Sequence, residues 1–306
     1  MPKTEIIVLG GGNSPERAVS LKSSAAVARA ARTAGFAVQV YDPADGLDFL
    51  DSLSKDVVVL PMLHGQGGED GVIQAELEKR GLQYLGASSK VSALCFDKDL
   101  ARQLFQEHTI PVAEGLTVTQ DNYSQQALAK KPHILKVSRG GSSIGTLFVR
   151  DPGAIDQGQV DEIFKMDDQA ILEELVEGVE ITVPVLDQKA LPVIEIQPPE
   201  SGEFDYENKY NGQTTELCPP ENVSQSAQAA AQRLAEKVHA VTGCRHLSRV
   251  DMFVCPGDRL VVLEINTLPG MTDQSLFPKC AQAAGISMPE LVRKFVAMVQ
   301  RDGPAI

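Results

Sequence analysis

Three side chains near the end of the chain have the types and the spacing of a ligand set for a divalent cation. Asp251 lies in a strand-like run, residues 250–255, and Glu264 and Asn266 lie in or just after the next run, residues 260–265. A Pro-Gly-Asp turn separates the two runs and predicts a β-hairpin. Because side chains alternate along a strand, Glu264 and Asn266 face the same side, and cross-strand pairing can bring Asp251 beside them.

Such a cluster favours a hard cation. Closely packed carboxylates repel each other, and each would cost several kcal/mol to bury alone. Mg²⁺ prefers a few carboxylate oxygens, with water and substrate phosphates completing its octahedron. The alternative is the solvated polar face of a hairpin. The stretch after Asn266, TLPGMTDQSL, favours a site, because it is polar, rich in turn residues and delivered by a strand end.

The composition disfavours several classes of protein. The chain has 306 residues, of which 43% are hydrophobic and 23% charged, as in soluble globular proteins. Its net charge of −13 disfavours nucleic acid as a partner, because phosphate backbones need a basic surface. No apolar run approaches the ~20 residues of a membrane helix. The five scattered cysteines, without a CxxC pair, predict a reduced, cytoplasmic protein.

The N-terminal segment predicts a parallel sheet. Residues 5–9, 18–34 and 37–41 predict a strand, a helix and a strand, with a glycine run after the first strand. This order is a βαβ unit. Ser14 and Pro15 suit the N-cap and the first turn of the helix. A dinucleotide-binding fold is the tempting alternative, but GGGNSP has proline where that fingerprint needs its third glycine.

Glu16 and His64 are the candidate site residues of this first unit. We expect Glu16 to be exposed at the start of the helix, and an ordinary first-turn acid favoured by the helix dipole is the alternative. His64 begins a glycine-rich loop, HGQGGEDG, at the carboxyl end of the strand predicted at 56–63. Open α/β sheets bind ligands at such ends, although a lone histidine there is commonly a hydrogen-bonded loop residue. A helix at 73–79 and a strand at 83–85 then close the unit.

Lys136 and the loop at 138–145 form a candidate anion site. The loop, SRGGSSIG, connects the strands predicted at 132–137 and 146–149. Its glycines free backbone N–H groups to point at one anion, and its serines add donors. It lacks the lysine and the following helix of a Walker loop, so a hairpin lid over phosphates fits better. A plain surface hairpin is the alternative, and Lys136 on the adjoining strand favours the anion site.

A long loop interrupts the remaining elements. Residues 198–220 are polar and carry Lys209 and Tyr210, and loops of this length in a compact domain are usually functional lids or disordered. An amphipathic helix is expected at 289–300. The other expected strands are 115–118, 170–175, 179–186 and 194–197, and the other expected helices are 98–108 and 223–242.

Together these segments resemble the ATP-grasp superfamily and, within it, the D-alanine–D-alanine ligases of bacterial cell-wall synthesis. The resemblance spans essentially the whole chain, and its motifs follow the family's order: GGNSPER, LHGQGGEDG, FDK, ILKVSRGGSSIG, LEEL with EGVEITV, YENKY, SRVDMFV and LEINTLPGMTDQSL. It implies an α/β chain, α+β in its ATP-grasp part, with three domains at 1–87, 88–177 and 178–306. The first is an open parallel-sheet domain, the second carries the glycine-rich phosphate loop, and the third carries the metal site and the lid loop.

The resemblance implies a role for each candidate residue. The implied ATP-binding residues are Lys98, Lys136, Gly141, Ser142, Ser143, Glu173, Glu174, Val176 and Glu180. The implied substrate-binding residues are Glu16, His64, Gly270, Ser275 and Leu276. The implied catalytic residues are Glu16, Ser142, Tyr210, Lys209 and Arg249. Two Mg²⁺ ions, for which Mn²⁺ can substitute, would be carried by Asp251, Glu264 and Asn266.

The implied reaction is the ATP- and Mg²⁺-dependent ligation of two D-alanines through a D-alanyl phosphate, with release of ADP and phosphate, for peptidoglycan synthesis. In the family, the ammonium of the first D-alanine is held at the glutamate that matches Glu16, in a network with Ser142 and Tyr210. Lys209 and Arg249 would neutralise the transferring phosphoryl group and the oxyanion. Cations are needed because a carboxylate and the γ-phosphate of ATP repel each other.

Some positions depart from the family pattern. This chain has Gly140 where the family commonly has an acidic residue and Glu174 where a lysine is common. It has Leu175 where a tryptophan is often found and Gln274 where a histidine is frequent. These departures bear on nucleotide affinity and lid closure more than on the reaction. A ligase that takes D-lactate or another second substrate is one rival, which Tyr210 disfavours. The other rival is a nucleotide-binding protein without ligase activity, or an NAD-linked oxidoreductase. If the chain is a ligase, we expect a cytoplasmic homodimer.

Overall fold

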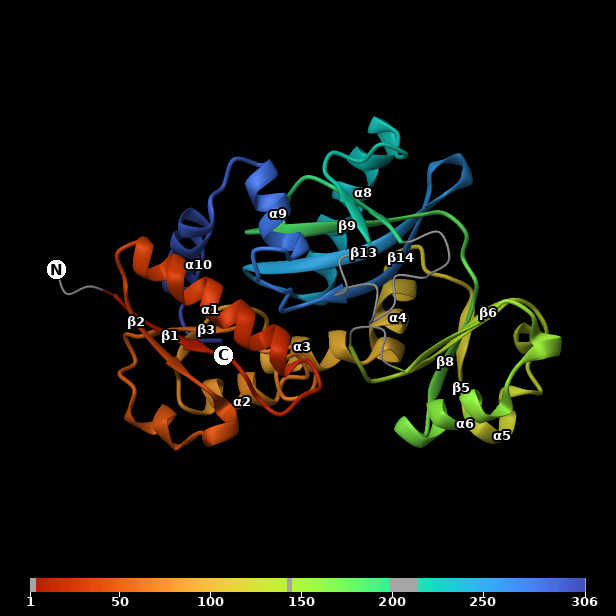
Figure 1. The fold of residues 1–306 in the computed structure, drawn as a ribbon, viewed down its shortest axis with the longest axis horizontal. Coiled ribbons are helices and arrows are strands. Elements are labelled where there is room, and N and C mark those ends of the chain that lie inside the picture. The colour runs from red at the N-terminus through yellow and green to blue at the C-terminus, as the bar shows by residue number, and fades with distance from the viewer. Residues whose placement is uncertain (1–3, 142–144, 199–213, 306) are drawn as a thin grey trace.

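The strands of the chain form separate sheets that lie side by side. The computed structural model describes residues 4–141, 145–198 and 214–305, and Figure 1 shows the N-terminal sheet at one end and the sheet of residues 115–174 at the other. The long strands β9 (Val179–Leu186), β13 (Leu247–Cys255) and β14 (Arg259–Asn266) lie between them (Figure 1). The mixed α/β fold class is confirmed.

The N-terminal sheet has the order β2-β1-β3-β4, and all its pairs are parallel, as expected. Alternate residues of β1 enter different cores: Ile6 and Val8 pack with α1, and Ile7 and Leu9 pack with α2. A strand buried on both faces needs a continuous apolar run, which explains the sequence EIIVL. The elements are β1 (Glu5–Leu9), α1 (Arg17–Thr33), β2 (Ala37–Tyr41), the 3₁₀ turns Pro43–Asp45 and Asp48–Ser52, β3 (Val58–Pro61), α2 (Val72–Lys79) and β4 (Gln83–Tyr84).

The central sheet is antiparallel in the order β5-β8-β6-β7. One face of it packs on α6, where Leu135 and Leu172 meet Val160 and Ile163. Residues between these apolar positions point to the other face, which is open to a cavity. The elements are β5 (Gly115–Val118), α5 (Gln120–Tyr123), β6 (His133–Val137), β7 (Thr146–Val149), α6 (Gln157–Met166) and β8 (Ala170–Glu174), with 3₁₀ turns at Leu128–Lys130 and Pro152–Ala154.

The C-terminal sheet has the order β12-β11-β9-β13-β14, with β10 pairing with β9. The helix α8 (Gln225–Thr242) packs on one face of it through Ala227, Ala231, Ala235 and Val238, which follow one another at helical spacing and are fully buried. Small side chains at this spacing let the helix lie close to the strands. The remaining strands of the sheet are β10 (Lys189–Ala190), β11 (Ile194–Gln197) and β12 (Thr215–Leu217).

Apolar clusters cross the predicted domain borders at 88 and 178. The helices α3 (Ser89–Phe96) and α4 (Lys98–Glu107) contribute to the core of the C-terminal sheet, where Phe105 belongs to the same cluster as Val250. The helices α9 (Leu276–Ala283) and α10 (Met288–Asp302) instead share a core with the N-terminal sheet, where Phe295 and Val8 belong to one cluster. The C-terminal end of the chain therefore packs against its beginning.

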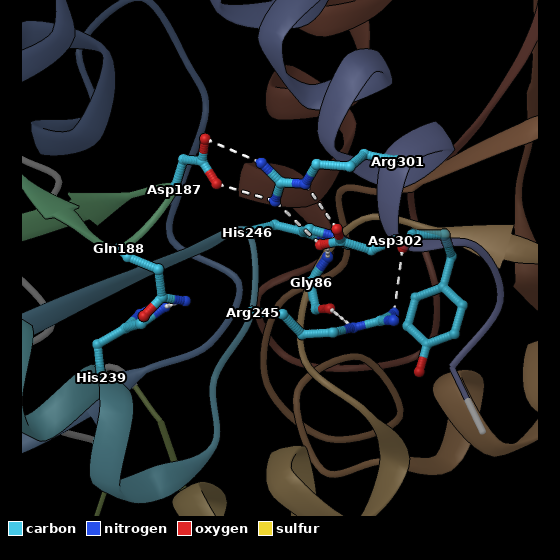
Figure 2. Close-up of polar contacts among 9 residues, drawn as sticks. Gly86, Asp187, Gln188, His239, Arg245, His246, Arg301 and Asp302 are labelled. Atoms are coloured by element: carbon cyan, nitrogen blue, oxygen red, sulfur yellow. Dashed lines mark hydrogen bonds and ion pairs between the residues drawn. The ribbon is translucent and has the colours of Figure 1, made fainter.

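Polar contacts also join the elements around the N-terminal sheet to those of the C-terminal sheet (Figure 2). Arg245, just before β13, donates from Nε to the carbonyl of Gly86, which follows β4, at 2.9 Å. Arg301 of α10 pairs with Asp187, at the end of β9, at 2.9 Å and with Asp302 at 2.7 Å. These contacts hold the N-terminal sheet and the C-terminal sheet together, on elements that also carry the candidate site residues.

Some expected elements differ from the structure. The helix α1 begins at Arg17 with Glu16 at its N-cap, and the cap expected at Ser14 is wrong. Ser14 is used in the turn before the helix, where its Oγ donates to the carbonyl of His64 at 2.7 Å. The expectation that Glu16 is exposed is also wrong, because its exposed fraction is 6%. Among the described residues, the α-helices and strands that the sequence did not predict are β10, β12, α3, α5, α6 and α9.

Candidate active site

Among the described residues, a larger and a smaller cavity share part of their lining. The shared residues are Lys98, Gly141 and Glu264. The larger, which we call the α1 cavity, has a volume of about 960 Å³ and lies between α1, the loop after β3 and the loop after β14. The smaller, which we call the β8 cavity, has a volume of about 630 Å³ and lies between the central and C-terminal sheets. The shared residues form the boundary between the two spaces.

The β8 cavity combines apolar walls with cations. Lys98, Lys136 and Arg150 line it, and Arg150 was not among the predicted residues. An apolar slot that also presents fixed cations suits a molecule with a flat base and an anionic tail, such as a nucleotide. The apolar lining from both sheets includes Ile134, Phe148, Leu175, Val176, Phe253 and Leu263.

Lys136 and Glu173 form a buried ion pair in this cavity. Lys136 alternates along β6 with Leu135, which faces the core, so its side chain faces the cavity. Its Nζ lies 2.7 Å from Glu173 Oε2, and the two side chains are 13% and 10% exposed. Arg102 of α4 approaches the other oxygen of Glu173, with Nε at 3.8 Å. Two cations therefore balance one carboxylate at the wall of the cavity.

Lys98 is positioned by the first turn of α4. Asp97 caps this helix by accepting from the backbone N–H groups of Asp99 and Leu100 at 3.1 and 3.2 Å. Ser138 ties the cap to the end of β6, because its hydroxyl donates to Asp97 at 3.2 Å. The ammonium of Lys98 donates to the carbonyl of Gly140, and it lies 3.9 Å from the carboxylate of Glu264. Lys98 therefore sits at the boundary of the two cavities.

The hairpin of β13 and β14 pairs Asp251 directly with Glu264, so cross-strand pairing brings these two carboxylates together, as expected. A 3₁₀ turn at Pro256–Asp258 connects the strands. The register shifts directly after this pair, so that Met252 faces Val262 and the intervening Leu263 is left without a cross-strand partner. This β-bulge lets Leu263 and Glu264, neighbours in sequence, both line the β8 cavity, which strict alternation would prevent.

The carboxylate of Asp251 is held by protein donors. Arg249 donates to both of its oxygens, at 2.9 and 2.6 Å, and Thr182 donates to Oδ1 at 2.5 Å. Asn266 lines the α1 cavity, and its side-chain oxygen accepts from the N–H of Leu268 at 3.0 Å. Arg249 and Lys98 therefore balance the two carboxylates of the hairpin.

This donor set fits Mg²⁺ of the kind that binds with substrate phosphates. Among the described residues, no group of three or more histidine, cysteine, aspartate or glutamate side chains could hold a metal. The hairpin offers Asp251, Glu264 and the amide oxygen of Asn266, which are too few ligands for an all-protein cage. Mg²⁺ usually keeps several waters and binds through one or two carboxylates and substrate phosphates, so the set is sufficient once a nucleotide is present.

The α1 cavity brings Glu16, His64 and Arg249 together. Glu16 is buried at the start of α1, and His64 is 6% exposed, with Nε2 3.1 Å from the hydroxyl of Ser23. Burial lowers the pKa of His64 to about 4, and the charge of Arg249 acts in the same direction, so the ring is neutral at pH 7. Glu69, which was not among the predicted site residues, also lines the cavity.

The loop after β14 closes the other side of the α1 cavity. Gly270, Ser275 and Leu276 line it, as predicted. The hydroxyl of Ser275 accepts from the N–H of Thr272 at 3.0 Å and contacts its hydroxyl at 2.8 Å, which folds the loop into a tight turn at the start of α9. A Cβ at Gly270 would lie 2.9 Å from Ser275 Oγ, so a side chain there would displace the serine that folds this turn.

Not every predicted residue joins these cavities. Glu174 is not among the residues that line the β8 cavity; its Oε1 accepts from the N–H of Glu114 at 3.1 Å instead. Side chains alternate along β8, so Glu173 and Glu174 face opposite sides. The other predicted ATP-binding residues in the described part of the chain, Gly141, Val176 and Glu180, line the cavity. The predicted residues Ser142, Ser143, Lys209 and Tyr210 lie outside the described residues.

Comparisons with known proteins agree with this geometry. Residues 104–297 match the model of the family described as "D-ala D-ala ligase C-terminus". The D-alanine–D-alanine ligase of Actinobacillus succinogenes is 37% identical over 306 residues, which cover 97% of this chain and 98% of that protein. The chain belongs to the D-alanine–D-alanine ligase family. The family resemblance inferred from the sequence motifs is therefore confirmed.

Solved structures of the family share the whole fold. The ATP complex of the D-alanine–D-alanine ligase from Bacillus anthracis has a TM-score of 0.84 at 27% identity and covers 98% of both chains. The VanG D-Ala:D-Ser ligase of Enterococcus faecalis has a TM-score of 0.82 at 29% identity, covering 97% of this chain and 99% of that one. None of the helices in the described part of this ligase-family chain has the length and apolarity needed to cross a membrane.

Proposed function

We propose that the chain catalyses the ATP-dependent joining of two D-alanines to D-alanyl-D-alanine, with release of ADP and phosphate, and so supplies a precursor of peptidoglycan. The observation that carries this proposal is the boundary between the cavities. Lys98 and Glu264 line both spaces, so a phosphoryl group leaving a nucleotide in the β8 cavity would reach an acceptor in the α1 cavity there.

The residues of the α1 cavity have the charges that an amino acid needs. Glu16 supplies a buried carboxylate for an ammonium, and Arg249 supplies a guanidinium for a carboxylate or for the acyl phosphate that replaces it. Neutral His64 can hydrogen-bond without adding charge. The second D-alanine would lie at the loop of Gly270 and Ser275, which lines the same cavity as Arg249.

The β8 cavity would hold ATP with its base between the sheets and its phosphates at the cations. Lys136 and Lys98 both line the cavity, and Lys98 also lines the α1 cavity, so they would contact different phosphates of ATP. Asp251, Glu264 and Asn266 would hold two Mg²⁺ ions, or Mn²⁺ in their place, and these ions would neutralise the phosphate oxygens. The roles of Ser142, Ser143, Lys209 and Tyr210 as a lid over both cavities rest on the family resemblance.

The second substrate is a point at which members of this family differ, as the D-Ala:D-Ser ligase among the similar structures illustrates. Gln274 lines the α1 cavity, where the family frequently has histidine. We propose D-alanine as the second substrate, because the motif YENKY keeps Tyr210 in the lid loop. D-Lactate and D-serine are the alternatives.

The assay for this function uses the purified chain with D-alanine, ATP and Mg²⁺. We expect D-alanyl-D-alanine by mass spectrometry, and ADP and phosphate whose release requires both D-alanine and the metal. Parallel reactions with added D-lactate or D-serine identify the second substrate. Hydrolysis of ATP without any dipeptide or depsipeptide product would contradict the proposal.

Three further properties extend this proposal. The enzyme would be cytoplasmic, since its substrates are cytoplasmic metabolites, and the family resemblance implies a homodimer. Its domains would be divided at 1–87, 88–177 and 178–306, with the helices α3 and α4 carried by the C-terminal core. Gel filtration with light scattering would measure the oligomeric state.

A further inference from the structure

Glu69 is a second acid in the α1 cavity, and no part of the proposed reaction uses it. It lies in the glycine-rich loop between β3 and α2, it lines the cavity together with Glu16, and it is 8% exposed. One oxygen, Oε2, accepts from the N–H of Gly65 at 2.8 Å. The other, Oε1, is buried and has no hydrogen-bond partner among the described residues. An unsatisfied buried oxygen is costly, so its presence in the cavity calls for a ligand.

Glu16 and Glu69 converge on the same glycines. A Cβ added to Gly65, whose N–H binds Glu69, would lie 2.4 Å from Glu16 Oε2. A Cβ added to Gly141 would lie 3.1 Å from Glu16 Oε2 and 3.8 Å from Glu69 Oε2. Both carboxyl groups therefore line the same corner of the cavity, where the backbone approaches closely because it has no side chains.

Two buried carboxylates so close together repel each other, and a proton on one of them relieves the repulsion. Burial and the neighbouring Glu16 raise the pKa of Glu69 to about 8, while the N–H of Gly65 and the charge of Arg249 act in the opposite direction. Glu264, from β14, adds to the raising effect, and His64 is neutral. At pH 7 the empty site therefore holds Glu69 as a neutral acid.

We propose that Glu69 is a second carboxyl contact for the ammonium of the first D-alanine and that it gives up its proton to solvent when that ammonium binds. The proposal rests on the proposed function, because it takes D-alanine as the ligand. An ammonium at the corner of Glu16 and Glu69 replaces the proton as the positive charge between them, and its N–H groups supply the missing partner of Glu69 Oε1. The step balances as one neutral acid and one ammonium giving a carboxylate–ammonium pair and one proton in the buffer.

This arrangement makes D-alanine binding dependent on pH. At pH 7 a group that titrates near pH 8 is almost fully protonated, so binding should release roughly 0.9 proton per D-alanine. At pH 8.5 roughly a quarter of a proton should remain to be released. The affinity of the first D-alanine should accordingly rise with pH through this window.

Isothermal titration calorimetry measures the released proton directly. D-Alanine is titrated into the full chain with Mg²⁺ and a non-hydrolysable ATP analogue, in phosphate and in Tris at the same pH. The dependence of the observed heat on the ionisation heat of the buffer gives the number of protons for the tighter binding event. The wild-type chain needs no substitution for this measurement, so a folding defect cannot obscure it.

Variants assign the proton to Glu69. Glu69→Gln keeps an acceptor for the N–H of Gly65 but has no proton to lose, so we expect no proton release at pH 7 and about 10- to 100-fold weaker D-alanine binding. Asp70→Asn is the matched control, because Asp70 lies in the same loop, accepts from Gly67 at 2.7 Å and does not line either cavity. It should leave the proton count unchanged, and neither variant should alter the affinity for the ATP analogue.

The outcomes are distinguishable. D-Alanine that binds the wild-type chain at pH 7 without releasing a proton overturns the role of Glu69 and leaves the proposed function intact. Proton release that persists in Glu69→Gln assigns the proton to another group and also overturns the inference. A chain that neither binds nor turns over D-alanine overturns the proposed function, and the inference falls with it.

Discussion

Replacing Lys136 with methionine should lower both the stability of the fold and the affinity for ATP. A second substitution at its partner Glu173 should restore only the stability. Methionine keeps most of the length and the apolar stem of the side chain but removes its charge. In the structure, Lys136 Nζ lies 2.7 Å from Glu173 Oε2, and both side chains are at most 13% exposed. The substitution therefore leaves a buried carboxylate that has lost its closest cation.

The magnitude follows from what remains around Glu173. Removing one partner of a buried pair typically costs about 3–5 kcal/mol, because the other charge is left uncompensated. Arg102 still approaches Glu173 at 3.8 Å, so we expect a loss at or below the lower end, about 2–3 kcal/mol. Adding Glu173→Gln should recover most of this loss, because the double variant no longer buries a carboxylate without its closest cation, and Arg102 keeps its hydrogen bonds to the carbonyls of Ala113 and Gly115. Affinity for ATP should instead stay about 10- to 100-fold weaker in both variants, because each lacks a charge-assisted contact to phosphate.

Calorimetry with ATP·Mg²⁺ and thermal unfolding measure the two effects on the same samples. Lys165→Met is the matched control, because Lys165 pairs with Glu162 on the exposed face of α6 at 2.6 Å, and exposed pairs contribute little. The control should change neither the affinity nor the unfolding temperature. Unchanged ATP affinity in Lys136→Met, or a double variant no more stable than the single one, would refute this account of the β8 cavity.

Three other substitutions give distinct expectations. Glu264→Ala should reduce turnover at least 10²-fold in a coupled assay for ADP, because it removes a predicted metal ligand at the boundary of the cavities. Gly65→Ala should raise the KM for D-alanine at least tenfold with little effect on the KM for ATP, since its Cβ would meet Glu16 at a backbone φ of 68°. The raised pKa of Glu69 stabilises the fold at low pH, and this stability is lost as the pH rises from its ordinary 4.5 to about 8. The unfolding temperature of Glu69→Gln relative to that of the wild type should therefore rise between pH 4.5 and pH 8 and stay constant above pH 8.

Much of the fold followed from local patterns. Strands buried on both faces, such as EIIVL and most of VEITVPVL, were predictable as short apolar runs rich in β-branched residues and bounded by turn residues. The hairpin that carries Asp251 and Glu264 was predictable because a short turn separates two strand-like runs, but its register at these two residues depends on the bulge after Asp251. Short helices such as α3 were missed because their stability comes from packing against other elements, which a local pattern does not reveal.

The parts of the site that were not predicted depend on contacts between distant segments. The β-bulge at Leu263 has no glycine or other local marker, although it decides which side chains reach the β8 cavity. Glu16 was expected on the surface, since a first-turn acid is ordinarily solvated, and it is buried by the loop of Gly65 and by Gly141. The same loop carries Glu69, and the acid in the motif HGQGGEDG is the sequence feature from which it could have been predicted.

Transfer of oxygen from substrate to phosphate is the most direct test of the central claim. D-Alanine labelled with ¹⁸O in its carboxylate is incubated with the chain, ATP and Mg²⁺, and the phosphate released is analysed by mass spectrometry. Attack of the carboxylate on the γ-phosphate, at the boundary of the two cavities, predicts one ¹⁸O in the phosphate for each dipeptide formed. Dipeptide accompanied by unlabelled phosphate would contradict an acyl phosphate, and with it the assignment of the two cavities.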